Sequence, residues 1–187
     1  MRLLDPAGSR RVPWKNGLGS TLEVATDAAV PGGDWTWRLS IADVPSRAPF
    51  SAYPGIDRFI ACLEGPGLVL ERGNARQSVP QEGAALAFPG EESVTGEPAG
   101  PGARDVNLML RRDRWRGRMT MVRGRALALE APLIVVHAAE GSAALLAETP
   151  EGRVTLEPGH TMIAGGRVDL ARAPGSVAAA CELHPID

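Results

Sequence analysis

Charged and polar side chains occupy positions where β-strands usually carry core residues. Arg38 and Ser40 alternate with apolar residues, Arg58 stands two positions from an isoleucine on either side, and Asp105 shares one face of a third alternating run with Asn107. Burying an isolated charge is expensive, so arginines that face inward need a partner. A guanidinium matches a carboxylate through two parallel hydrogen bonds. We therefore expect these side chains to form the polar inner face of a hollow.

Two interpretations of the arginines remain open from the sequence. In the first, Arg38 and Arg58 pair with Asp43, Asp57 or Asp105 as a buried structural network. In the second, the two guanidinium groups hold the carboxylate of a small acid. The two interpretations are compatible, because a polar network can open to admit a ligand.

The elements that would position these side chains are short antiparallel strands. Residues 35–41 alternate in polarity at every step, with Arg38 and Ser40 on one predicted face. The apolar residues on the other predicted face are Trp35, Trp37, Leu39 and Ile41. Further strands are expected at 58–63, after which a Gly-Pro-Gly turn leads to 68–70, and at 105–111. We predict that these strands form the first wall of a small β-barrel.

Other catalytic chemistry has little support in the sequence. The three histidines, His137, His160 and His184, show none of the close spacings that place two ligands on one metal, so we predict no metal and no cofactor. Cys62 lies in an apolar run typical of an inert thiol, and the sequence assigns no role to Cys181. The best candidates for a general base are Asp57 and Asp105, and no catalytic residue is assigned.

Composition limits the protein class. The 187 residues carry 20 basic and 22 acidic side chains, which gives a net charge of −2 without a basic cluster, so nucleic-acid binding is not expected. No apolar run is long enough for a membrane helix and no secretory leader is recognisable, so a cytoplasmic protein is the expectation. The 22 glycines and 16 prolines are dispersed, which predicts many short strands joined by tight turns. An exposed edge strand favours a homodimer.

The order of predicted strands in the first half recurs more weakly in the second. We expect strands at 133–137, 143–148, 154–156 and 161–164, and this repetition predicts two β-units, 1–125 and 126–187. The basic stretch 111–125 is interpreted as a solvated connection between them, and 91–102 as a polar loop. The alanine-rich run 177–181 is compatible with either helix or strand.

Four segments taken together resemble the HutD/Ves family of cupin-like proteins. In order along the chain they read WKNGLG at 14–19, WRLSIA at 37–42, PFSAYPGIDR at 49–58 and DVNLM at 105–109. Leu18 stands where the family usually has a third glycine. The resemblance covers roughly the first 110 residues and implies an all-β, cupin-like (RmlC-like jelly roll) double barrel, a bicupin. Seven positions carry over as a candidate pocket, to which the strand pattern adds Ser40: Lys15, Asn16, Arg38, Ser51, Arg58, Asp105 and Asn107.

The resemblance also implies a protein without established catalysis. HutD proteins are linked to histidine utilisation, with N-formylglutamate or urocanate proposed as ligands, and Ves proteins to stress responses. We expect a metal-free protein that binds a small carboxylate and has a regulatory or accessory role. The rival hypotheses are an isomerase or hydrolase acting on a small organic acid through Asp57 or Asp105, and an interaction module that uses an exposed Trp35 or Trp115.

Overall fold

Strands make up nearly all of the regular structure, as the alternating patterns and the dispersed turn residues predict. The computed structural model describes residues 1–14, 20–30 and 32–186. Within these ranges the chain forms strands β1 to β18 and a single 3₁₀ turn, η1 (Pro6–Gly8), so the fold is all-β. Lys15 and Asn16, both predicted site residues, lie outside the described residues.

A central six-stranded sheet carries the segments that the sequence analysis singled out. Its strand order is β10-β6-β12-β4-β3-β2, and every pairing is antiparallel. The bounds are β2 (Arg10–Pro13), β3 (Ser20–Thr26), β4 (Trp37–Asp43), β6 (Ile56–Glu64), β10 (Leu86–Pro89) and β12 (Arg104–Arg111). Strand β12 lies between β4 and β6, so it has hydrogen-bonded neighbours on both sides.

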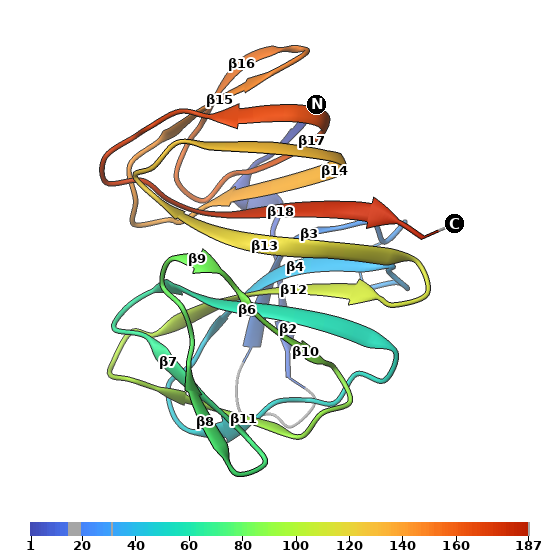
Figure 1. Ribbon diagram of the computed structural model, residues 1–187, viewed down its shortest axis with the longest axis vertical. Coiled ribbons are helices and arrows are strands. Elements are labelled where there is room, and N and C mark those ends of the chain that lie inside the picture. The colour runs from blue at the N-terminus through green and yellow to red at the C-terminus, as the bar shows by residue number, and fades with distance from the viewer. Residues whose placement is uncertain (15–19, 31, 187) are drawn as a thin grey trace.

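Two further sheets flank the central one (Figure 1). A four-stranded sheet has the order β5-β11-β7-β8, formed by β5 (Ala48–Pro49), β7 (Leu68–Arg72), β8 (Ala75–Ser78) and β11 (Val94–Pro98). An eight-stranded sheet has the order β16-β15-β17-β14-β18-β13-β9, with β1 paired to β17. Its bounds are β1 (Arg2–Leu4), β9 (Gly83–Ala84), β13 (Trp115–Arg123), β14 (Leu127–Ala138), β15 (Leu145–Thr149), β16 (Gly152–Leu156), β17 (Thr161–Leu170) and β18 (Val177–Pro185).

The two faces of the central sheet differ in what they pack against. On one face Trp37, Leu39 and Ile41 of β4 are buried against β13, β14 and β18 of the eight-stranded sheet, as the alternation predicted. The opposite face packs in part against the four-stranded sheet, through residues such as Ile60, Leu70 and Phe88. Arg38 and Ser40 belong to this second face, because successive side chains of a strand point to opposite sides.

Two segments differ from the sequence-based expectation, and the run 177–181, compatible with either helix or strand, forms a strand. Residues 115–123 form strand β13 rather than a solvated connection, because Met119 and Met121 occupy alternate positions on a buried face while Arg116 and Arg118 are exposed. Residues 94–98 form β11 within the expected loop, and 177–185 form β18. These segments form strands because their backbones pair with neighbouring strands, and this pairing overrides local propensity.

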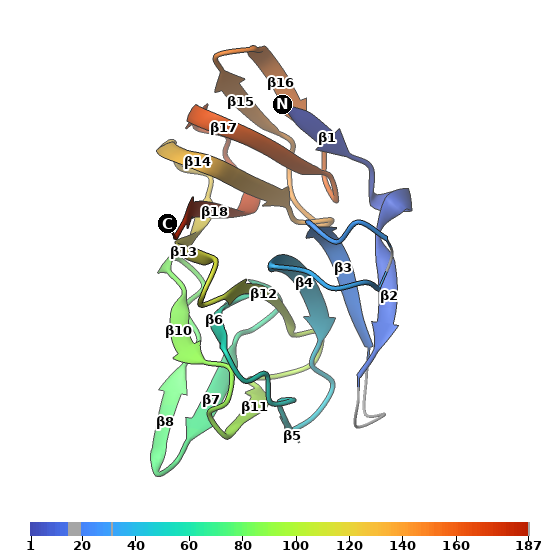
Figure 2. The same cartoon turned by 90° about the vertical axis from the view of Figure 1, so that its right-hand side faces the viewer.

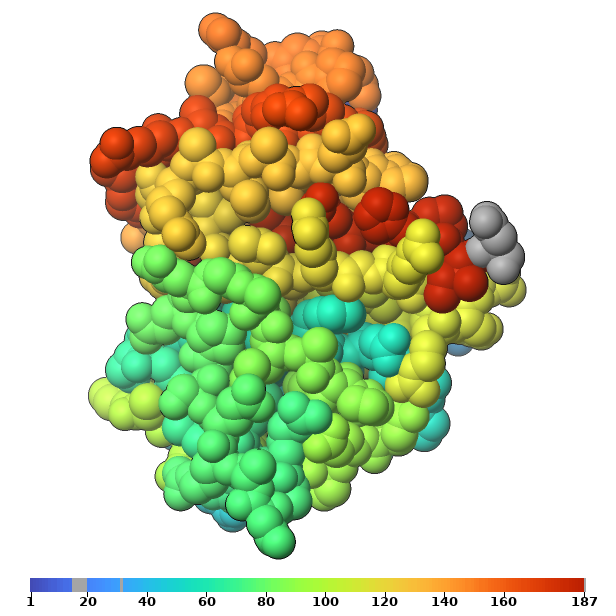
Figure 3. Space-filling model, in the orientation of Figure 1, coloured from blue at the N-terminus to red at the C-terminus, as the bar shows by residue number. Residues whose placement is uncertain are grey.

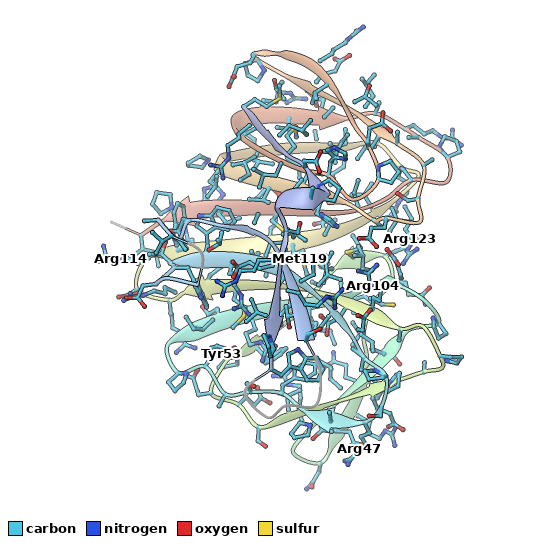
Figure 4. All side chains as sticks on the ribbon, turned by 180° about the vertical axis from the view of Figure 1, so that it is seen from behind. Arg47, Tyr53, Arg104, Arg114, Met119 and Arg123 are labelled. Atoms are coloured by element: carbon cyan, nitrogen blue, oxygen red, sulfur yellow. The ribbon has the colours of Figure 1, made fainter. Side chains whose placement is uncertain are left out.

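The ends of the two predicted units are connected by sheet pairing and by ion pairs. Strand β1, from the start of the chain, pairs with β17 (Figure 2), and β13 pairs with β18. Arg104 forms ion pairs with Glu64 at 3.1 Å and with Glu140 at 3.0 Å. Figure 4 shows it near the level at which the central and eight-stranded sheets meet. The space-filling view shows these two parts in broad contact (Figure 3).

In the described ranges, no helix has the length and apolar character needed to span a membrane. Both cysteines are buried and free.

Gly65 offers a test of how the turn between β6 and β7 is packed. It has φ of 86°, and a Cβ there would collide with the backbone of Gly102. Gly65→Ala is therefore expected to lower the free energy of unfolding by about 2–4 kcal/mol, the sum of a left-handed backbone penalty and a steric clash. The matched control is Gly73→Ala, at φ of 54° with open space around the added Cβ, which should lose only about 1 kcal/mol. Equal losses in urea unfolding would contradict the packing described.

Candidate functional site

The candidate site is built from rungs of side chains across β4, β12 and β6. In an antiparallel pair, directly opposed residues have Cβ atoms about 4.5–5.5 Å apart. Strand β12 contributes the middle residue of each rung, so residues distant in sequence become neighbours. The three rungs are Arg38–Met109–Arg58, Ser40–Asn107–Ile60 and Ala42–Asp105–Cys62. A register shift in the β12–β6 ladder falls between Arg104 and Asp105, and such irregularities often lie beside functional sites.

A cavity of about 50 Å³ opens over these rungs. The loop between β5 and β6 covers one side of it, and residues next to β2 and in β3 contribute the rest. The loop residue Tyr53 is labelled in Figure 4, well away from Met119, which packs between the central and eight-stranded sheets. The lining residues are Trp14, Thr21, Arg38, Ser40, Ala42, Pro49, Phe50, Ser51, Tyr53, Arg58, Asp105, Asn107 and Met109.

Arg58 is the most deeply buried cation of the site, with 5% of its surface exposed. Its guanidinium carbon lies 4.9, 5.8 and 5.2 Å from the ring centroids of Phe50, Tyr53 and Phe88. These π faces attract the cation electrostatically. Nη1 donates to the carbonyl oxygen of Ser51 at 3.3 Å, while Nε has no partner among the described residues. Burial lowers the pKa of Arg58 to about 10, so the group stays charged at neutral pH.

Arg38 is held more loosely at the other end of the same rung. Its guanidinium lies 5.3 Å from the ring centroid of Trp35, and Nη2 donates to Sδ of Met109 at 3.6 Å. Nη1 and the Glu23 carboxylate are 3.9 Å apart. The Nε–H again has no acceptor in the described chain. Trp35 precedes strand β4, and its ring contacts Arg38 on the polar face of the sheet. The alternation had predicted that Trp35 would lie on the apolar face.

Asp105 is the only carboxylate among the described lining residues, and 3% of its surface is exposed. Burial raises the pKa of Asp105 to about 7, against the opposing attraction of Arg58. Its Oδ1 lacks a hydrogen-bond partner in the described protein, and so do Oδ1 of Asn107 and Oγ of Ser40. Buried polar atoms without partners are rare in proteins because each costs about 1–3 kcal/mol. The cavity thus presents donors and acceptors that a small polar molecule can satisfy.

The structure brings six of the eight predicted site residues to this cavity. They are Arg38, Ser40, Ser51, Arg58, Asp105 and Asn107, and the remaining two, Lys15 and Asn16, lie outside the described residues. Asp57 does not line the cavity and pairs with Arg112 at 2.7 Å. Asp43 pairs with Arg104 at 3.3 Å. Neither aspartate pairs with Arg38 or Arg58, so of the three partners that the structural-network interpretation offered only Asp105 lines the cavity.

Sequence patterns do not predict the aromatic part of the site or the carboxylate beside Arg38. Phe50 and Tyr53 lie in an irregular segment, where no periodicity tells which side chains turn inward. Glu23 is opposite Ser40 in the β3–β4 pair and so lies diagonal to Arg38, a neighbour relation that depends on which strands pair. For one further lining residue, Met109, the sequence did contain a signal. The alternation of 105–111 places Met109 on the same face as Asp105 and Asn107.

The histidine and cysteine side chains of the described residues are not grouped into a metal site or a catalytic site with one another. Within residues 1–14, 20–30 and 32–186, no three His, Cys, Asp or Glu side chains are grouped as ligands for a metal ion. His137 is buried, its Nδ1 lies 2.9 Å from the Thr161 hydroxyl, and burial lowers its pKa to about 4. Burial also raises the pKa of the Cys62 thiol. These groups are therefore neutral at physiological pH.

Comparison with known proteins gives consistent relatives. An uncharacterised 21.2 kDa protein in the hutC 3′ region of Pseudomonas putida is 36% identical over 121 residues, which cover 64% of this chain and 63% of that protein. Protein Ves of Cronobacter sakazakii is 35% identical over 119 residues, which cover 60% of this chain and 65% of Ves. The chain thus matches less than two thirds of the length of these curated relatives.

Solved structures match over almost the whole chain. A conserved protein of unknown function from Pseudomonas aeruginosa has a TM-score of 0.81 at 30% identity, with 98% of each chain covered. HutD from Pseudomonas fluorescens has a TM-score of 0.76 at 25% identity, covering 100% of this chain and 99% of that one. The HutD family model matches residues 7–180, a range that contains every lining residue of the cavity. The chain therefore belongs to the HutD family.

Proposed function

We propose that this protein binds the carboxylate group of a small metabolite in the Arg58 cavity, as a metal-free, cupin-like protein with a regulatory or accessory role in histidine utilisation. One observation carries the proposal. The Arg58 guanidinium is buried, and in the described part of the chain no carboxylate oxygen lies within 4.0 Å of it. A carboxylate entering the cavity would supply the missing counter-charge.

The size of the cavity restricts which part of a ligand it holds. A cavity of about 50 Å³ has room for roughly three to five water molecules at about 10–15 Å³ each. That is enough for a carboxylate group and a short neighbouring segment. Formate or acetate would fit entirely, whereas urocanate or N-formylglutamate would place one carboxylate inside and the rest of the molecule at the mouth, beside Trp14.

The unpartnered polar atoms suit this orientation. The Nε–H groups of Arg38 and Arg58 approach from the two ends of one rung and would donate to the carboxylate. Ser40 and Asn107, on the next rung, would fix the adjoining part of the ligand through hydrogen bonds. The link to histidine utilisation is supported by the names of two relatives, the protein of the hutC 3′ region and HutD.

Ligand-induced stabilisation tests the proposal. A ligand that binds only the folded state raises the melting temperature, and a concentration 100 times the dissociation constant adds about 2.7 kcal/mol. We expect at least one of formate, acetate, urocanate and N-formylglutamate to raise the melting temperature at millimolar concentration, and Arg58→Ala to abolish the rise. The measurement is differential scanning fluorimetry of both proteins over a ligand titration.

Arg76→Ala serves as the matched control. Arg76 is an exposed arginine of the edge strand β8, paired with Glu97 at 2.7 Å, so its loss should leave the ligand-induced rise intact. If none of the four acids stabilises the wild-type protein, or if Arg58→Ala responds as strongly as wild type, the proposed site is wrong.

A second candidate function is proton transfer on a small organic acid. Asp105 favours it, because a general base works best with a pKa near the operating pH and burial brings the pKa of Asp105 to about 7. An isomerase or hydrolase of this kind should turn over one of the screened acids, and Asp105→Asn should abolish turnover while Asp57→Asn does not. Absence of any product by NMR after prolonged incubation would leave binding as the function.

The third hypothesis, an interaction module, loses its main support. Trp35 and Trp115 are half-buried rather than exposed. The Trp115 indole donates to the Thr36 hydroxyl at 2.6 Å, and Trp35 stacks against Arg38. Both rings are thus used inside the chain.

A further inference from the structure

Asp105 and Arg58 share the cavity without forming a close ion pair. Asp105 lies on the third rung and Arg58 on the first, so one rung separates them. Each leaves one buried polar atom without a partner in the described chain. Both groups therefore remain available to a molecule that enters between them.

The charges that face Asp105 come from each strand packed beside it. On β6 these are Arg58 and the buried, neutral Cys62. On β4 the exposed Asp43, next to the Ala42 that opposes Asp105, adds a repelling negative charge and is already paired with Arg104. Arg38, on the far rung, is balanced by Glu23. Tyr53 closes the loop side. Arg58 is thus the cation that governs the charge of Asp105.

The sum of these charges differs between the two states of Asp105. When Asp105 is ionised, it balances Arg58, and an entering carboxylate leaves one uncompensated negative charge in a buried space. When Asp105 carries a proton, the ligand carboxylate balances Arg58 and the site is neutral. Uncompensated buried charge is strongly unfavourable, and two carboxylates sharing one site rarely stay ionised together.

We propose that a carboxylate ligand binds this cavity together with one proton, which is taken from solvent by the free oxygen of Asp105, so that binding strengthens as the pH falls. This inference rests on the proposed function. The proton forms a new O–H bond on Asp105, and that O–H then donates to the ligand carboxylate. Asp105 acts here as a positioning group and a proton acceptor, without any covalent change in the ligand.

The titration of Asp105 places the effect near neutral pH. Burial raises the pKa of Asp105 to about 7 in the free protein, and a second anion alongside raises it further. At pH 6 the group is already protonated, so binding takes up almost no proton. Above pH 7 Asp105 is ionised in the free protein, so each binding event must add one proton to it. The dissociation constant therefore rises by about tenfold per pH unit.

Isothermal titration calorimetry with N-formylglutamate between pH 6 and pH 9 tests the inference. Both carboxyl groups of this probe have pKa values of about 3.3–4.3 and stay ionised throughout, so the probe contributes no titration of its own. Paired runs in phosphate and Tris, which differ in ionisation enthalpy, count the protons taken up. We expect weaker binding above pH 7 and an uptake approaching one proton per ligand.

Two variants isolate Asp105. Asp105→Asn retains an N–H donor but cannot ionise, so its dissociation constant should not change with pH and the buffer dependence should vanish. Asp57→Asn, at an exposed carboxylate of β6 outside the cavity, should keep the full pH dependence. A wild-type affinity that is constant from pH 6 to pH 9, or an unaltered pH profile in Asp105→Asn, would overturn the proton linkage alone. No binding at any pH would overturn the proposed function with it.

The ligand-free protein gives an independent readout. The pKa of Asp105 is higher in the folded chain than its ordinary value of about 3.9, so the folded state holds the proton more tightly. Its contribution to stability therefore falls as the pH rises from about 4 to about 7 and is constant above. Asp105→Asn should melt at a higher temperature than wild type at pH 8, and this advantage should shrink towards pH 4. An advantage that does not vary with pH would show that Asp105 is not the titrating group.

Discussion

The site depends on keeping the Arg58 guanidinium charged between two sheets, away from bulk water. A charged group in this position is stable only if its surroundings replace the interactions it had with solvent. Here three aromatic rings, one backbone carbonyl and a carboxylate beyond ion-pair distance share that role. None of these partners occupies the Nε–H edge of the guanidinium. The part of the group best suited to bind a carboxylate is thus the part left free.

The rest of the fold can be understood as support for this arrangement. The apolar face of the central sheet is packed against the eight-stranded sheet, which fixes β4, β12 and β6 side by side. On the opposite face, Ile60 and Cys62 contribute to the apolar contact with the four-stranded sheet, while polar residues of the same strands line the cavity. One face of the central sheet is therefore apolar and stabilises the fold. The other face has an apolar part that packs against the four-stranded sheet and a polar part that lines the cavity. Phe88 belongs to the apolar contact and also stacks on Arg58, so it connects the two.

Period-two alternation predicted the part of this arrangement that depends on strands alone. It placed Arg38 and Ser40 together, and Asp105 with Asn107, because side chains of a regular strand must alternate between faces. It could not predict which strands pair, and the pairing is what brings Met109 between Arg38 and Arg58. The loop that carries Phe50 and Tyr53 has no period, and Trp35 lies before the strand begins. The pairing of β3 with β4, which places Glu23 opposite Ser40 and near Arg38, leaves no trace in local sequence. The local sequence did not predict strand β13, because its three arginines concealed an alternation that its buried methionines show.

The distance between Asp105 and Arg58 reflects a compromise between stability and binding. A direct ion pair would satisfy both groups, and breaking it to admit a ligand would then cost several kcal/mol. A cavity with Arg58 alone would leave the guanidinium without a counter-charge before the ligand arrived. With one rung between them, each lowers the energy of the other through space while neither blocks access. The ligand-free protein thus retains unsatisfied polar atoms, which raise its free energy relative to that of the ligand-bound protein. That difference is what a ligand of complementary charge gains on entering.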